Sequence, residues 1–396
     1  MPLPLNEKLR SWWWHRQGLD GSLAGASPEE VLGRSGWARS VGGVGPYLTL
    51  FSRAGTSREA ADEAVKKVEI HELPAVRGCT YVVPASDFAL ALASGESAAG
   101  VELKVAAKLG VTDKEIDQLC EAVLKALAKG PLDPEEIRAA VGNAARHLGE
   151  EGKKKGMITT LPLALGKLQS SGDLRRVSQN GRFDQQRYKY AVWKPNPLAK
   201  FKMTAEQVQT EVARRYFKWT GPATIAEFQW FSALSGKAAK AAIEPLKLES
   251  IEEGRMLLPE DRDDFEKFKP AKQSQFALVS SIDGVSLLRR DLNSLLDPAD
   301  QSQKLLKREG AGANVLDLPS HGIFDRGRLV GLWEYDTATE AIAWMSFIPK
   351  SADLKKAVER TEEYVRTQLG DARSFSLDSP KSRVPRIEAI RQTKPI

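Results

Sequence analysis

Apolar residues recur at helical spacing after a series of capping signals along the chain. After Thr112-Asp-Lys-Glu115 they follow at positions 116, 119, 120, 123, 124 and 127, and after Thr204-Ala-Glu-Gln207 they follow at 208, 212 and 216. Both starts have a hydroxyl at the N-cap and Glu or Gln three residues later, the capping-box pattern. These patterns predict amphipathic helices over about 113–127 and 205–220.

A longer unit repeats around these helices. Gly130-Pro131 leads to a second capped start at Asp133-Pro-Glu-Glu136, and Gly221-Pro222 leads to Thr224-Ile-Ala-Glu227, 91 residues later. An earlier start, Ser27-Pro-Glu-Glu30, has the same form. The economical interpretation is three related helical units in tandem.

The segments that follow these starts indicate what the unit is. A helix is expected from Thr159-Thr160, with Pro162 in its first turn, to Ser171-Gly172. Extended segments at 174–179 and 182–193 flank Asn180-Gly181, which is a strong signal for a two-residue hairpin turn. Helices followed by a hairpin predict a winged helix, and a helix from Ser235 with a turn at Glu253-Gly254 predicts the next one.

Beyond a polar linker at about 260–274 the pattern changes to short apolar strands. Turns are expected at Asp283-Gly284 and Arg326-Gly327, and one amphipathic helix is expected between Ser351 and Gly370. The basic segment from about Ser379 is expected to be mobile. The predicted fold class is therefore α+β: tandem winged-helix domains followed by a small β-barrel-like domain. The predicted domains are 1–110, 111–200 (the basic unit), 201–272 and 273–396.

Composition excludes several classes of protein. The 396 residues are 42% hydrophobic and 28% charged, as in a soluble globular chain. The sequence contains no uninterrupted stretch of about 18 apolar residues, so no membrane span is predicted. A cytoplasmic protein is expected. Cys79 and Cys120 are far apart and the four histidines are scattered, which argues against a disulfide scaffold or a zinc finger. No metal or other cofactor is expected.

The charge is concentrated in one region. Residues 152–219 contain fifteen Lys or Arg and four Asp or Glu, which gives this region a net charge of +11. The whole chain has a net charge of +6, so the rest of the chain carries −5. Because phosphate contacts supply most non-specific nucleic-acid affinity, the block predicts a duplex DNA partner. A solvated basic surface and a protein-interaction module are the alternatives. The candidate DNA-binding residues, on the predicted recognition helix, on the wing and before them, are Lys153, Lys154, Lys155, Thr159, Thr160, Lys167, Gln169, Arg175, Arg176, Arg182, Arg187 and Lys189.

Several segments, in their order and spacing, resemble the AlkZ-like winged-helix DNA glycosylases. The segments that carry the resemblance are Pro46–Arg53, Val76–Asp87, Tyr216–Phe228 with Trp230-Phe231-Ser232, Ser281–Asp291 and His321–Trp333. The resemblance implies three tandem winged helices closed by a small β-barrel into a concave DNA-binding surface. It also implies hydrolysis of the N-glycosidic bond of alkylated or crosslinked bases.

The resemblance further implies a catalytic Gln-hydrophobic-Gln or Gln-hydrophobic-Asp triplet shortly before Pro46-Tyr47. Counting back without gaps places Arg39, Ser40 and Val41 there, and neither Arg39 nor Val41 can orient or activate a water molecule. The adjoining Val41–Gly45 is expected to be a flexible hinge rather than a phosphate loop. Acids and bases nearby that are candidate substitutes are Glu69, His71, Glu72 and Asp87.

These observations predict a DNA-binding protein built like the glycosylases, without their usual catalytic residues, that engages duplex DNA through tandem winged helices. An active monofunctional DNA glycosylase that uses relocated residues is the alternative. A winged-helix regulator or protein-interaction scaffold is the second alternative. Trp12, Trp13 and Trp14 are candidates for stacking on an unpaired base, with at least one of them expected to be partly exposed.

Overall fold

The computed structural model describes residues 5–182, 184, 187–252, 254–301, 303, 306 and 316–393, and it shows a mixed α and β protein. No helix within these ranges is long and apolar enough to cross a membrane.

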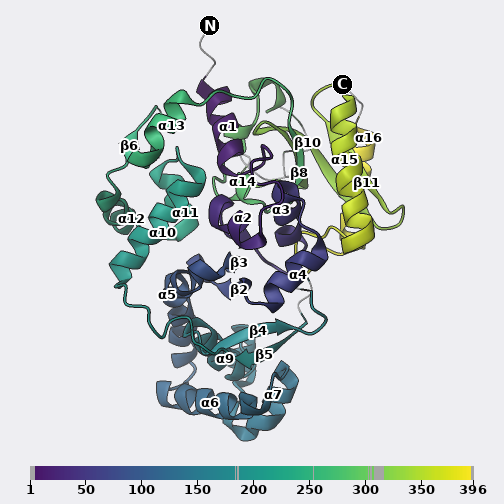
Figure 1. Ribbon diagram of the computed structural model, residues 1–396. Coiled ribbons are helices and arrows are strands. Elements are labelled where there is room, and N and C mark those ends of the chain that lie inside the picture. The colour runs from purple at the N-terminus through teal and green to yellow at the C-terminus, as the bar shows by residue number, and fades with distance from the viewer. Residues whose placement is uncertain are drawn as a thin grey trace.

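A small antiparallel sheet, with strands in the order β1-β3-β2, lies near the centre of the molecule (Figure 1). It was not predicted from the sequence. Its strands are β1 (Ala38–Arg39), β2 (Ile70–Pro74) and β3 (Thr80–Pro84). The helices of this part of the chain are α1 (Leu5–Arg16), α2 (Pro28–Ser35), α3 (Gly45–Ala54), α4 (Arg58–Lys66) and α5 (Phe88–Ala107).

The next region contains helices followed by a hairpin. The elements are α6 (Asp113–Ala126), α7 (Pro134–Val141), α8 (Gly149–Lys154), α9 (Leu161–Ser170), β4 (Leu174–Ser178) and β5 (Tyr188–Val192). The predicted caps are present: Thr112 accepts a hydrogen bond from the Glu115 amide, and Asp133 and Glu136 form a capping box. These local hydrogen bonds explain why the helices begin where the sequence predicted.

The β4–β5 hairpin corrects the expected two-residue turn. Ser178 pairs with Tyr188, so more than two residues join the strands, and Gly181 has a positive φ (80°) whereas Asn180 does not. A type I′ turn requires a positive φ at both positions. Arg182 is instead held by the helical turn that follows residue 364, because it donates a hydrogen bond to the carbonyl of Leu369 (3.0 Å).

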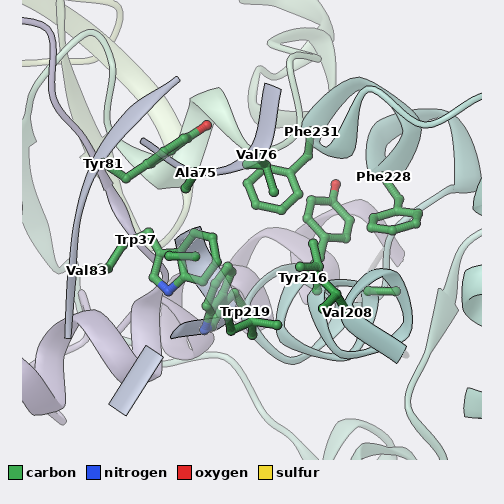
Figure 2. Close-up of a cluster of buried hydrophobic side chains, with 14 of the residues drawn as sticks. Trp37, Ala75, Val76, Tyr81, Val83, Val208, Tyr216, Trp219, Phe228 and Phe231 are labelled. Carbon is green, nitrogen blue, oxygen red and sulfur yellow. The ribbon is translucent and has the colours of Figure 1, made fainter. Parts of the chain in front are cut away.

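Residues 201–272 form a second group of helices with a short hairpin. The elements are α10 (Ala205–Thr220), α11 (Ile225–Ser232), α12 (Gly236–Ile243), β6 (Glu249–Ser250), β7 (Met256–Leu257) and α13 (Arg262–Lys267). Figure 2 shows the aromatic core that joins α10 and α11 to the central sheet, with Trp37 beside Trp219 at 5.3 Å between ring centroids. The core therefore fixes these helices relative to the strands of the candidate site.

The last part of the chain is a four-stranded antiparallel sheet in the order β11-β10-β9-β8. Its elements are β8 (Phe276–Val279), α14 (Gly284–Leu287), β9 (His321–Asp325), β10 (Arg328–Asp336), β11 (Ala341–Ser346), α15 (Ala352–Tyr364) and α16 (Pro380–Gln392). Among the described strands, β8 and β11 are edges that do not pair with each other. Arg326-Gly327 forms the predicted turn, but Asp283 caps α14 instead of turning between strands.

Two further expectations were wrong. The segment from Ser379 is the helix α16, which buries Ile387 and Ile390 in a hydrophobic cluster that also contains side chains of α1, β9 and β10. Trp12, Trp13 and Trp14 are all buried, with at most 3% of each residue exposed. Three adjacent aromatic residues cannot share one helix face, but α1 is enclosed on several sides, by α13 and by the sheet that contains β10 (Figure 1).

Candidate functional site

The segment where the resemblance placed a catalytic triplet lies at the end of strand β1. Arg39 pairs with Tyr81 of β3, and its guanidinium lies over the Tyr81 ring at 5.3 Å. The Ser40 amide continues the pairing by donating a hydrogen bond to the carbonyl of Thr80 (3.0 Å). Since successive side chains of a strand point to opposite faces, Arg39 and Ser40 face different pockets.

The first pocket, which we call the Glu72 pocket, has a volume of about 300 Å³. Three segments far apart in the sequence form it: the central sheet, the β4–β5 hairpin and the turn at 375–377. The residues that line it are Ser40, Val41, Gly42, Val65, His71, Glu72, Thr80, Arg176, Ser178, Arg182, Tyr188, Phe375, Ser376 and Leu377. The basic hairpin therefore contributes arginines to the site at the sheet.

Glu72 is held at both carboxylate oxygens. The Ser40 hydroxyl donates a hydrogen bond to Oε2 at 2.6 Å, and Nη1 of Arg176 donates to Oε1 at 3.3 Å. Arg176 in turn lies over the ring of Tyr188 at 4.4 Å. The Glu72 side chain is 19% exposed, so the carboxylate has a fixed orientation and remains accessible from the pocket.

The other candidate substitutes have different surroundings. Glu69 is exposed and does not line the Glu72 pocket. His71 is 2% exposed, and burial lowers its pKa to about 3, with the charges of Arg175 and Arg176 acting in the same direction. Asp87 is buried, where it accepts a hydrogen bond from the Trp37 indole (2.8 Å) and pairs with Arg215. Asp87 therefore stabilises the core.

The second pocket, which we call the Trp230 pocket, has a volume of about 370 Å³. The guanidinium of Arg77 lies over one ring of Trp230 at 4.3 Å, and that of Arg290 lies 5.0 Å from it. Arg39, Cys79, Tyr81 and Phe375 also line this pocket. A third hollow, of about 490 Å³, shares Glu72, Thr80 and Arg176 with the Glu72 pocket and Arg77 with the Trp230 pocket. The three hollows therefore adjoin around the end of the central sheet.

The remaining basic candidates in the region 111–200 differ in exposure and in their partners. Lys153, Lys154 and Lys155 are exposed at the end of α8, and Arg187 is exposed on the hairpin loop. Lys167 pairs with Asp117, Lys189 with Glu136 and Arg182 with Asp184, while Arg175 is half-buried. Neighbouring acids thus neutralise part of the charge of the basic block.

Three polar candidates are not presented on an exposed surface. Thr160 is fully buried next to the start of α9, and its hydroxyl accepts a hydrogen bond from the Arg146 amide (3.1 Å). Thr159 and Gln169 are each 8% exposed. Each of these side chains is therefore at most 8% exposed, and Gln169 lines the third hollow.

The glycine-rich segment 41–45 packs tightly and is not the open hinge that the sequence suggested. A Cβ on Gly43 would lie 2.4 Å from the backbone carbonyl of Ser374, and the Ser376 amide donates a hydrogen bond to the carbonyl of Val41 (3.0 Å). This contact holds the turn at 375–377, which lines both pockets.

We predict that Gly43→Ala lowers the free energy of unfolding by about 1–3 kcal/mol, because the added methyl group must displace the backbone of Ser374. Gly33→Ala is the matched control, since Gly33 lies within α2 and has no atom within 4 Å of the new Cβ. The control should stabilise the protein by roughly 0.5–1 kcal/mol. Denaturant unfolding measures both variants, and equal effects would contradict the close packing at Gly43.

Comparisons with known proteins agree with this architecture. A family model described as DNA glycosylase AlkZ-like matches residues 44–369. Among solved structures, the DNA glycosylase AlkZ of Streptomyces sahachiroi is similar, with a TM-score of 0.68 and 21% sequence identity, over 95% of this chain and 99% of that chain. At this identity the likeness shows a shared fold. The comparison with curated proteins found no match.

Proposed function

The chain belongs to the AlkZ-like DNA glycosylase family, and from this membership we propose that it is a DNA-repair protein that binds duplex DNA over the face where the Glu72 and Trp230 pockets open. We further propose that its helical units act as winged helices. In this proposal the β4–β5 hairpin turns arginines toward the pockets, and the family's glutamine triplet is replaced by Arg39-Ser40-Val41.

The arginines around the two pockets are the observation that carries the proposal. Arg176 and Arg182 line the Glu72 pocket, and Arg39, Arg77 and Arg290 line the Trp230 pocket. A row of guanidinium groups beside hollows is suited to the phosphates of a nucleic-acid backbone, because Arg presents several donors in a fixed planar geometry.

Two of these arginines retain an unneutralised charge. In the part of the chain that the structure describes, neither Arg39 nor Arg77 has a carboxylate within salt-bridge distance; each donates to a backbone carbonyl, of Thr80 and of Trp230 respectively. Arg77 is exposed, and its stacking on Trp230 limits its conformations. A preorganised and unpaired cation loses little on binding a phosphate, so Arg77 is the best single probe of the proposed interface.

We predict that Arg77→Ala weakens binding to a labelled duplex about equally for all sequences and lowers the slope of log affinity against log salt by about one. Fluorescence anisotropy at several salt concentrations measures both quantities. Lys355→Ala is the control, because Lys355 is exposed on α15 and lines neither pocket. Equal effects of the two variants, or no binding by the wild-type protein, would overturn the proposed interface.

The alternative of an active glycosylase is favoured by one specific observation. The Glu72 pocket contains an oriented carboxylate beside Ser40, at the place where the resemblance expects a catalytic residue. A carboxylate is one of the groups that can orient or deprotonate water.

A further inference from the structure

We infer that Glu72 is a relocated catalytic residue: it activates the water that hydrolyses the N-glycosidic bond of a modified nucleotide unstacked into the Glu72 pocket. The inference rests on the proposed DNA binding and adds to it a reaction and the residue that performs it. It would make the chain a glycosylase in which the water-activating group comes from β2 and not from the segment before Pro46-Tyr47.

The position of Glu72 on the sheet supports this role. Strand β3 lies between β1 and β2. Its residue Val82 pairs with Ala38 on one side and with Glu72 on the other, so Ala38 and Glu72 are in register across the sheet. Side chains two residues apart share a face, so Ser40 and Glu72 face the same side and meet across β3 at 2.6 Å. The Glu72 carboxylate therefore lies at the place where the triplet was expected, although β2 comes about 30 residues after residues 39–41 in the sequence.

The surroundings leave Glu72 as the group able to perform this chemistry. Among the described residues that line the pocket, it is the only acid. His71 is buried and held neutral, and Arg39 faces the Trp230 pocket. Each oxygen of Glu72 accepts one hydrogen bond from the protein, and a carboxylate oxygen has two lone pairs, so one remains to accept from water.

The pocket has the features of a site for an unstacked base. Its volume of about 300 Å³ is at the lower end of the range for ligand sites. Tyr188 and Phe375 provide aromatic surfaces on which a base can stack. Leu377, which is 83% exposed, stands at the rim on a turn fixed by the Ser376–Val41 hydrogen bond. An exposed apolar side chain at this place is suited to fill the gap that an extruded base leaves in the stack.

The reaction balances without any cofactor. Water attacks C1′ of the nucleotide, and an O–C1′ bond forms as the C1′–N bond breaks. The electron pair of the broken bond stays on the base nitrogen, and the water proton passes to the Glu72 carboxylate. A base with an alkylated ring nitrogen carries a positive charge and leaves as a neutral molecule, so no second acid is required. Alkylated bases are already the substrates that the family membership implies, and the new element here is the assignment of Glu72 as the group that activates the water.

Ser40 and Arg176 act as positioning residues. The Ser40 hydroxyl fixes the Oε2 atom of Glu72, and Arg176 fixes Oε1 while the Tyr188 ring limits its own motion. The competing explanation is that Glu72 only anchors the hairpin to the sheet through Arg176. A purely structural role would affect DNA binding and stability, whereas a catalytic role affects the rate of base release.

The test measures base release by the full-length protein from a duplex that contains N7-methylguanine, under single-turnover conditions. Glu72→Gln keeps the shape of the side chain and one acceptor oxygen but cannot accept the proton, so the rate should fall by at least about 100-fold. Duplex affinity should not fall, because the change removes the acid that neutralises Arg176. Glu69→Gln, which removes the same charge at an exposed position three residues earlier, should behave as wild type. Ser40→Ala should lower the rate about tenfold through the lost hydrogen bond.

The outcomes separate this inference from the proposed function. Duplex binding by the wild-type protein without base release would overturn the role of Glu72 and leave the DNA-binding proposal standing. Full activity of Glu72→Gln would also overturn the inference. Absence of duplex binding would instead overturn the proposed function on which the inference depends. If Glu72→Gln fails to fold, Ser40→Ala decides, because a wild-type rate in that variant contradicts the proposed geometry.

Discussion

Raising the salt concentration from 50 to 200 mM is expected to weaken duplex binding by roughly a thousandfold, if the face with the two pockets contacts about six phosphates. Each phosphate that a cation neutralises releases counterions, so affinity falls steeply as the bulk salt rises. The side chains placed to make these contacts are Arg39, Arg77, Arg176, Arg182 and Arg290, together with the exposed Arg187. Equilibrium binding to an undamaged duplex over this salt range measures the slope.

The same measurement tests the scaffold hypothesis. A protein-interaction module that carries basic residues only for solubility would show weak duplex binding with a shallow slope. Several arginines on this face are partly neutralised: Arg176 pairs with Glu72, Arg182 with Asp184 and Arg290 with Asp317. A slope much below that expected for six phosphates would show that these acids keep their partners in the complex and would contradict the predicted magnitude.

Local hydrogen bonds explain which parts of the fold the sequence predicted. The starts of α6, α7, α10, α11 and α12 depend on side chains within three residues of the cap, such as Thr204 and Gln207, so the signal is contained in a short segment. The turn at Arg326-Gly327 is equally local, with positive φ at both residues. Elements of this kind can be predicted without knowledge of the tertiary structure.

The central sheet was missed because its signal is weak and its partners are distant. Strand β1 has only two residues, and β2 has no exposed residue, so neither gives a clear alternation of apolar and polar positions. The run Thr80-Tyr-Val-Val was the available signal, because β-branched and aromatic residues favour strands. The site depends on this sheet, and therefore the contact between Ser40 and Glu72 could not be predicted from spacing alone.

The β4–β5 hairpin is a second case in which contacts between distant residues limited the sequence-based prediction. Asn-Gly favours a two-residue turn locally, but Arg182 and Asp184 are held by distant residues: Arg182 donates to the carbonyl of Leu369, and Arg373 donates to the carbonyl of Asp184. Tertiary hydrogen bonds therefore override the local preference. The same docking brings Arg176 and Tyr188 over the Glu72 pocket, so the wrong turn prediction and the unexpected site have one physical cause.

The buried ion pair between Arg53 and Asp283 joins α3 to the N-terminus of α14. Arg53 at the end of α3 donates to both carboxylate oxygens of Asp283, at 2.8 and 2.9 Å, and both side chains are at most 1% exposed. Burial alone would raise the pKa of Asp283, but the charge of Arg53 and hydrogen bonds from Arg53, the Val285 amide and the Thr49 hydroxyl lower it below its ordinary value of 3.8. The pair therefore favours the ionised carboxylate in the folded state.

We predict that Asp283→Asn lowers the free energy of unfolding at neutral pH by about 3–5 kcal/mol, because it leaves the charge of Arg53 buried without a carboxylate to neutralise it. Asp263→Asn is the control: Asp263 pairs with Lys267 on the surface, where such pairs contribute less than about 1 kcal/mol. Denaturant unfolding compares the two. Since the folded-state pKa of Asp283 is lowered, its contribution is present above the unfolded pKa and is lost as the pH falls through the folded pKa. The difference between wild type and Asp283→Asn should therefore shrink under acidic conditions, and a difference independent of pH would contradict a stabilising charge at this position.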